Sequence, residues 1–244
     1  MTAVANQWLM EHGKRRTGEL WVVCIPYAGG GASVYSSWAP LVPPHVRLFG
    51  LQLPGRENRL AEPALADMTE VLNAAGPALA EALREPFILL GHSAGAVVAF
   101  ALARWLEDHA GLRACKLLAA GSPAPHASCP WLNDLPDLEL RQQLEAMGGT
   151  PAELLAHKEL MELLAPTLRA DLRVTETYCS NDRIHCPIAA FGGSTDSLAT
   201  REQLLEWRVH TSSSFSLTMV PGDHFFIRQP SVVMPYLVHQ MTLD

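Results

Sequence analysis

The stretch FILLGHSAGAVVAF, residues 87–100, decides the fold, because it places a serine between two glycines directly after an apolar run. The run FILL predicts a buried strand, and the alanine- and valine-rich segment after Ser93 predicts a helix. Residues 91–95, GHSAG, therefore form the turn between a strand and a helix. This is the context that the G-x-S-x-G motif requires, so the stretch predicts an α/β chain with a serine at the edge of its sheet.

Ser93 is the candidate nucleophile. The glycines on either side let the strand and the helix approach each other without a clash between Cβ atoms, so the hydroxyl group is pushed out at the carboxyl end of the strand. The N-terminus of the following helix favours negative charge that develops beside the serine. The alternative is a structural turn that happens to contain a serine. A catalytic serine, by contrast, needs a base within hydrogen-bond reach and a group that orients the base.

Short apolar runs and helical patterns alternate along the chain on both sides of this turn. Six buried strands are expected, at residues 20–25, 46–52, 87–90, 116–120, 188–193 and 214–220. Helices are expected between most of these strands and after the last one, at residues 67–84, 94–109, 200–210 and 230–241. Such alternation predicts a mostly parallel sheet flanked by helices. The whole length, 1–244, fits a single domain of this kind, since no linker argues for two.

The interval from about 122 to 186 breaks this alternation, because it contains helical patterns and no convincing strand. One helix is expected at residues 139–149, with Gly148 as the glycine that ends it. A later helix is expected to begin near Pro166, with the proline in its first turn. We interpret the interval as a helical insertion into the domain.

Leucines recur every four residues in the second half of this insertion, at Leu160, Leu164, Leu168 and Leu172. The spacing gives one apolar face. The insertion is either extra packing against the core or a lid whose side chains line an apolar acyl-binding cavity. For a lid, the expected lining residues are Met147, Met161, Leu164 and Leu168.

A histidine and an acidic residue near the ends of later strands complete the candidate site. In hydrolases with such a turn, the order along the chain is serine, acid, histidine. His224 follows the last expected strand, in the loop VPGDHFF, whereas His92 is expected to point to the other side of the turn. Asp196 follows the preceding strand and is the expected orienting acid; Asp223 is a weaker choice, because a residue adjacent to the histidine can rarely reach the far imidazole nitrogen. The non-catalytic alternatives are that His224 is only a polar residue of its loop and that Asp196 is only the cap of the following helix.

Two backbone N–H groups are expected to bind the negatively charged oxygen of a tetrahedral intermediate, as an oxyanion hole. One belongs to the residue after the nucleophile, Ala94, and the other to the loop after an early strand. The loop IPYAGGGAS, residues 25–33, offers Ala28, with Gly29 as the alternative. This glycine-rich loop is a weak signal by itself, but it has neither of the glycine patterns that bind phosphate.

Composition and charge argue against several other classes of protein. The formal net charge of −7 and the lack of a basic block argue against nucleic-acid binding. Five cysteines without a C-x-x-C pair fit neither a disulfide framework nor a zinc site, and no metal or cofactor is expected. A signal peptide and a membrane-spanning stretch are not indicated, so we expect a cytoplasmic protein with no membrane partner. We also expect a monomer, since no heptad pattern stands out.

Six stretches of the sequence point to one family. They are IPYAGGGASVYSSW at 25–38, LQLPGRENRLAEP at 51–63, GHSAGAVVAFALA at 91–103, LRADLRVTETY at 168–178, CPIAAFGGSTDSL at 186–198, and Trp207 together with FSLTMVPGDHFFI at 215–227. On these motifs the chain resembles, nearly from end to end, the stand-alone type II thioesterases that accompany polyketide synthases and nonribosomal peptide synthetases. LPGRENR and LRADLRVTETY contain no residue with an evident catalytic role, so their match to the family favours common descent over convergent chemistry. The departures are small: Ala94 stands where the family often has methionine, and Ser197 where a proline often follows the aspartate.

The resemblance implies an α/β-hydrolase fold with a mobile helical lid and a triad of Ser93, His224 and Asp196. It also implies substrates that are acyl or peptidyl thioesters on the phosphopantetheine arm of a carrier protein, which binds transiently, and hydrolysis that removes misprimed or stalled groups. Two alternatives stay open: a small-molecule carboxylesterase with the same triad, and a non-enzymatic binding protein on the same fold. Arg56 and Arg59 could contact the carrier protein, although a structural role in their loop is the favoured interpretation.

Overall fold

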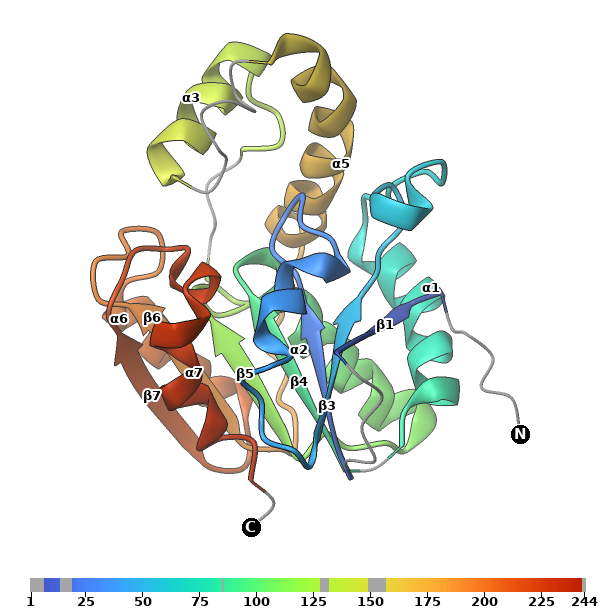
Figure 1. Ribbon diagram of the computed structural model, residues 1–244, viewed down its shortest axis with the longest axis vertical. Coiled ribbons are helices and arrows are strands. Elements are labelled where there is room, and N and C mark those ends of the chain that lie inside the picture. Colours follow the sequence, from blue (N-terminus) through green and yellow to red (C-terminus); the bar gives the residue numbers. More distant parts are fainter. Residues whose placement is uncertain (1–6, 14–18, 85, 128–131, 149–156, 243–244) are drawn as a thin grey trace.

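The computed structural model of the protein describes residues 7–13, 19–84, 86–127, 132–148 and 157–242. A central sheet lies between helices, and two further helices stand beyond one end of its strands (Figure 1). Among the described residues, no helix is both long enough and apolar enough to cross a bilayer.

In the described part of the chain, the sheet has seven strands in the order β1-β3-β2-β4-β5-β6-β7. The strands are β1 (Leu9–His12), β2 (Leu20–Ile25), β3 (Val46–Leu51), β4 (Phe87–His92), β5 (Lys116–Ala120), β6 (Ile188–Gly193) and β7 (Phe215–Val220). β1 pairs with β3 in the antiparallel direction, and the other neighbouring strands are parallel. The mostly parallel sheet and its six predicted strands are confirmed. β1 is an additional edge strand that the sequence pattern does not predict.

Helices cover both faces of the sheet. They are α1 (Met68–Ala82), α2 (Ala94–Trp105), α3 (Asp137–Met147), α5 (Lys158–Glu176), α6 (Arg201–Leu205) and α7 (Pro230–Val238), with the short helices η1 (Ala32–Trp38), η2 (Glu57–Arg59), η3 (Leu106–Ala110), η4 (Glu206–His210) and η5 (Phe226–Arg228). Side chains of α1, α2 and α6 pack in the apolar cluster on one face, and those of η1 and α7 pack in the cluster on the other. Because both faces are covered, every residue of β4 is buried, which explains its continuous apolar run.

α3 and α5 form a lid at the carboxyl ends of the parallel strands (Figure 1); we use this name for residues 132–148 and 157–176. Leu140 and Leu144 of α3 and Met161 of α5 form a small apolar cluster that joins the two helices. α3 ends at Gly148, which adopts the left-handed conformation with φ of 72°, as the sequence predicts. The lid therefore has a small core of its own.

α5 runs without interruption through Pro166, so the prediction that a helix begins at this proline is wrong. The helix begins at Lys158, where the side chain of His157 accepts a hydrogen bond from the N–H of Leu160. A proline inside a helix removes one backbone hydrogen bond and crowds the preceding turn. Packing of the apolar face of this long helix outweighs that local cost.

Candidate active site

The turn between β4 and α2 holds Ser93 in a conformation that residues other than glycine rarely adopt, with φ of 54° and ψ of −126°. A Cβ atom at Gly91 would lie 2.0 Å from the carbonyl oxygen of Gly95, and one at Gly95 would lie 2.3 Å from that of Ile25. The N–H of Ser93 donates to the carbonyl of Ala120 on β5, at 2.8 Å. The flanking glycines and this hydrogen bond together explain why the turn holds its strained geometry.

The side chains of Ser93, His224 and Asp196 form one chain of hydrogen bonds. Oγ of Ser93 lies 3.1 Å from Nε2 of His224, and Nδ1 of His224 lies 2.9 Å from Oδ2 of Asp196. The three residues follow β4, β7 and β6, so the parallel sheet brings them together at the carboxyl ends of its strands. His224 and Asp196 are buried, and Ser93 is partly exposed.

Asp196 is held in place by its second carboxylate oxygen. Oδ1 accepts hydrogen bonds from the N–H groups of Leu198, at 2.8 Å, and Ala199, at 3.2 Å. These contacts lie within the loop before α6, which is capped by Thr200, so Asp196 is not the helix cap. Asp223 turns its carboxylate to the N–H of Phe225, at 2.9 Å. It is Asp196, and not Asp223, that contacts the imidazole of His224.

His92 lies against the site, contrary to the expectation that it points to the other side of the turn. Its ring centroid is 5.1 Å from that of His224, and the side chain is fully buried. Burial lowers the pKa of His92 well below the usual value of 6.5, and the proximity of His224 lowers this pKa further. His92 is therefore a neutral ring that packs beside the triad histidine.

The structure distinguishes between the candidates for the oxyanion hole. Ala28 and Ala94 both line the cavity beside Ser93. The N–H of Gly29, the alternative to Ala28, already donates to Oδ2 of Asp171 on α5, at 2.7 Å. An amide that is engaged by a carboxylate is not available to an incoming oxygen. Ala28 and Ala94 therefore stay the proposed pair of donors.

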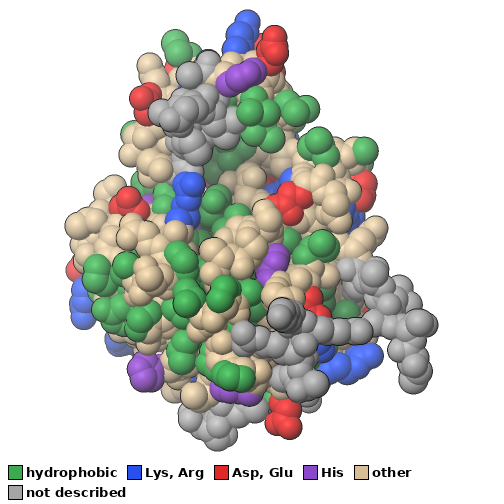
Figure 2. Space-filling view, in the orientation of Figure 1, with side chains coloured by type: hydrophobic (Ala, Val, Ile, Leu, Met, Phe, Trp, Pro, Cys, Tyr) green, Lys and Arg blue, Asp and Glu red, His purple; other side chains and the backbone are tan. Residues whose placement is uncertain are grey.

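An apolar cavity of about 170 Å³ lies between the lid and the sheet, with Ser93 and His224 in its wall. The lid contributes the apolar side chains of Leu132, Leu144, Met147, Leu168 and Leu172. Tyr27, Val97, Leu198 and Phe225 line it from the rest of the molecule. The space-filling view shows hydrophobic side chains in the recess beneath the lid (Figure 2).

Two of the four predicted lid residues, Met147 and Leu168, line this cavity. Met161 instead packs in the cluster between α3 and α5, and Leu164 is half-buried outside the lining. Leu172 lines the cavity and could have been chosen from the leucine repeat, whereas Leu132 lies in a loop without a sequence signal.

The charged residues near the site are engaged within the protein. Arg56 pairs with Asp171 and Arg59 with Glu62, each with a closest nitrogen–oxygen distance of 2.5 Å, and both arginine side chains are buried. These contacts match the structural interpretation of the two arginines and do not support a direct role in binding a partner. Among the described residues, no group of three or more histidine, cysteine or acidic side chains is arranged to hold a metal ion.

The arrangement suits nucleophilic attack on a carbonyl group. Nε2 of His224 is within reach of the Ser93 hydroxyl proton, and Asp196 contacts the other ring nitrogen, which fixes the tautomer that accepts this proton. The N-terminus of α2 favours negative charge on the carbonyl oxygen.

Comparison with known proteins identifies relatives over nearly the whole chain. The profile of the family described as "Thioesterase domain" matches residues 21–236. The gramicidin S biosynthesis protein GrsT of Aneurinibacillus migulanus is 37% identical over 233 residues, which cover 94% of this chain and 91% of GrsT. Among solved structures, RedJ, a thioesterase from the prodiginine pathway in Streptomyces coelicolor, is 32% identical with a TM-score of 0.86, over 92% of this chain and 91% of its own. BorB, the type II thioesterase from the borrelidin cluster, is 31% identical with a TM-score of 0.86, over 96% and 98%.

Proposed function

The chain belongs to the thioesterase domain family, has the α/β-hydrolase fold and is a hydrolase, and from this premise we propose that it cleaves acyl or peptidyl thioesters from the phosphopantetheine arm of a carrier protein. The observation that carries the proposal is the hydrogen-bonded chain of Ser93, His224 and Asp196 in the wall of an apolar cavity. The carrier protein as partner is supported by relatives from pathways of peptide and polyketide biosynthesis.

In the first half of the reaction, Oγ of Ser93 attacks the thioester carbonyl carbon while Nε2 of His224 takes the hydroxyl proton. The carbonyl oxygen becomes negatively charged and is bound by the N–H groups of Ala28 and Ala94. The carbon–sulfur bond then breaks, and the departing pantetheine thiolate takes the proton from His224. An acyl group now remains on Ser93. A backbone donor of this kind contributes about 3 kcal/mol to the stability of the transition state.

In the second half, His224 takes a proton from a water molecule that attacks the acyl-serine. The same two amides bind the oxyanion, and His224 gives its proton to Oγ of Ser93 as the ester bond breaks, which releases the acid and restores the Ser93 hydroxyl. The carboxyl group of Asp196 contacts the imidazole and stabilises the imidazolium ion in both halves. Each proton transfer through His224 accelerates its step by about 10²- to 10⁴-fold.

The first test compares one butyryl group in two forms: as a thioester on a phosphopantetheinylated carrier protein and as a simple oxygen ester. We expect the wild-type protein to hydrolyse the carrier-bound thioester with a much higher kcat/KM. Ser93→Ala is expected to lower kcat by about 10⁵- to 10⁶-fold, because the covalent route is lost. A preference for the oxygen ester would instead favour the carboxylesterase.

A labelling control accompanies these rates. A fluorophosphonate is expected to modify the wild-type protein at Ser93 and to leave Ser93→Ala unmodified. A wild-type protein that is folded yet resists labelling and hydrolyses neither substrate would favour the non-enzymatic binding protein.

A further inference from the structure

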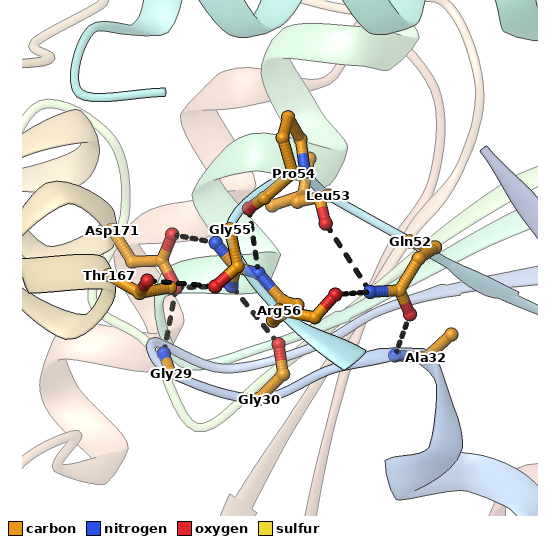
Figure 3. Close-up of polar contacts among 10 residues, drawn as sticks. All are labelled: Gly29, Gly30, Ala32, Gln52, Leu53, Pro54, Gly55, Arg56, Thr167 and Asp171. Carbon is orange, nitrogen blue, oxygen red and sulfur yellow. Dashed lines mark hydrogen bonds and ion pairs between the residues drawn. The ribbon is translucent and has the colours of Figure 1, made fainter. Parts of the chain in front are cut away.

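The loop that carries Ala28 is held from outside the active site by a buried polar network (Figure 3). Its centre is an ion pair between Arg56, which follows β3, and Asp171 of the lid helix α5. Nη1 of Arg56 lies 2.5 Å from Oδ2 of Asp171, and Nη2 lies 2.7 Å from Oδ1, so the two groups meet in a fork. Both side chains are more than nine-tenths buried.

The same carboxylate also binds the loop itself. Oδ2 of Asp171 accepts a hydrogen bond from the N–H of Gly29, at 2.7 Å, and Nη1 of Arg56 donates to the carbonyl of Gly30, at 3.1 Å. The N–H of Gly29 belongs to the peptide group that joins it to Ala28. Fixing this peptide group restricts the rotation about the backbone bonds of Ala28 and therefore the direction of the Ala28 N–H.

Further contacts tie the loop to the segment after β3. The N–H of Ala32 donates to Oε1 of Gln52, at 2.9 Å, and the hydroxyl group of Ser33 donates to Oε1 of Glu57, at 2.5 Å. Glu57 has a positive φ of 48°, an uncommon conformation for this residue type. Residues from both motifs therefore contact this loop: Arg56 and Glu57 from LPGRENR, and Asp171 from LRADLRVTETY.

A separate hydrogen bond joins α5 to the segment after β3 without touching the loop. Oγ1 of Thr167 donates to the carbonyl of Gly55, at 2.9 Å. Thr167 is one turn before Asp171 on the same face of α5, and it offers a matched control because its removal loosens the same contact between helix and segment.

We propose that Asp171 is a positioning residue that, together with Arg56, fixes the Ala28 amide in the oxyanion hole. The proposal rests on the acyl-serine mechanism of the proposed function. An experiment can separate this positioning role from a purely stabilising one, because apolar side chains can replace a buried ion pair without loss of stability. Such a replacement cannot hold the N–H of Gly29.

The decisive variant is therefore the double substitution Arg56→Met with Asp171→Leu, which removes both charges. Thr167→Val is the control, and Ser93→Ala is run beside them. The measurements are kcat and KM for the thioester of butyrate with N-acetylcysteamine, thermal unfolding, and inhibition by a propyl trifluoromethyl ketone, whose adduct with the serine carries a negatively charged oxygen.

We expect the double variant to unfold within a few degrees of the wild type and to keep its KM. Its kcat is expected to fall by about 10- to 100-fold, part of the loss seen when an oxyanion donor is removed outright. The inhibition constant of the ketone is expected to rise by a similar factor, and Thr167→Val is expected to match the wild type. A double variant with wild-type kcat, or a Thr167→Val variant that loses as much, overturns the proposal.

A second comparison keeps the question answerable if the double variant does not fold. Asp171→Asn keeps an oxygen that can accept from Gly29, whereas Asp171→Ala does not, so we expect a higher kcat per labelled serine in the asparagine variant. Equal values overturn the proposal. Activity in Ser93→Ala would show that the proposed mechanism is wrong, a failure that is independent of these comparisons.

Discussion

His92 is a buried histidine that lies beside the candidate active site. The ring is fully buried next to His224, and a T-shaped contact places it against Phe226 at 5.4 Å between ring centroids. Desolvation is the main reason that its pKa lies well below 6.5. The folded protein therefore keeps this histidine neutral at a pH at which the unfolded chain protonates it.

This difference predicts a pH dependence of stability. Below pH 6.5 the unfolded chain binds a proton that the folded protein does not, so the free energy of unfolding falls as the pH falls; above pH 6.5 His92 contributes no such slope. The slope reaches about 1.4 kcal/mol per pH unit for one proton. We expect urea unfolding of His92→Phe to show a smaller loss between pH 7.5 and pH 5.5 than the wild type.

Other histidines do not obscure this comparison. Burial also lowers the pKa values of His12 and His210, but both residues are present in the two proteins, so their contributions cancel in the difference. Parallel stability curves for the wild type and His92→Phe would contradict the prediction.

At the residue scale, chain order and strand ends were enough to predict which serine, acid and histidine lie together, because these features follow from the topology of a parallel sheet. The position of His92 could not be predicted in this way. Where a side chain in a tight turn points depends on the backbone angles of the turn and on what fills the space behind it. The choice between Ala28 and Gly29 likewise depended on Asp171, which is far from both in the sequence.

Among the elements, α5 departs most from the sequence prediction. The local pattern around Pro166 is typical of a helix start, yet the helix passes through it. Tertiary packing overrides such local preferences when a long apolar face is buried. β1 was missed because it has only four residues, pairs only at the edge of the sheet and lacks a buried alternating pattern.

Pro166 therefore offers a test of helix energetics. Its ring is exposed within α5, so Pro166→Ala restores a backbone hydrogen bond without removing core packing. We expect the free energy of unfolding to rise by about 1 to 3 kcal/mol. Pro230→Ala is the control, since this proline starts α7, where the lost N–H has no helical partner. A lower melting temperature for Pro166→Ala would show that a bend at this residue is needed to seat the lid.

For the whole molecule, composition and periodicity were enough to predict the layers of the fold but not how the lid meets the body. The network around Arg56 and Asp171 joins residues that are distant in the sequence and are polar in a buried setting. No periodic pattern marks such a pair. That residues 1–244 form a single domain stays a prediction, as does the monomeric state.

Net charge makes a prediction at the same scale. The protein carries a formal charge of −7, so an acidic carrier protein is not attracted over long distances, and added salt screens repulsion rather than attraction. Between about 50 and 300 mM salt, we expect kcat/KM for the carrier-bound thioester to stay constant or rise. The neutral N-acetylcysteamine thioester serves as the control. A tenfold fall confined to the carrier-bound substrate would contradict this expectation.

The two faces of α5 constrain how such a protein can diversify. Leu168 and Leu172 form part of the cavity wall, while Asp171 contacts the loop that carries Ala28. Substitutions that shift α5 to admit a bulkier acyl group would also disturb the loop, so selection on turnover opposes them. Leu144 and Met147 of α3 line the cavity from the other side. New acyl preferences should therefore evolve, and be engineered, through α3 first.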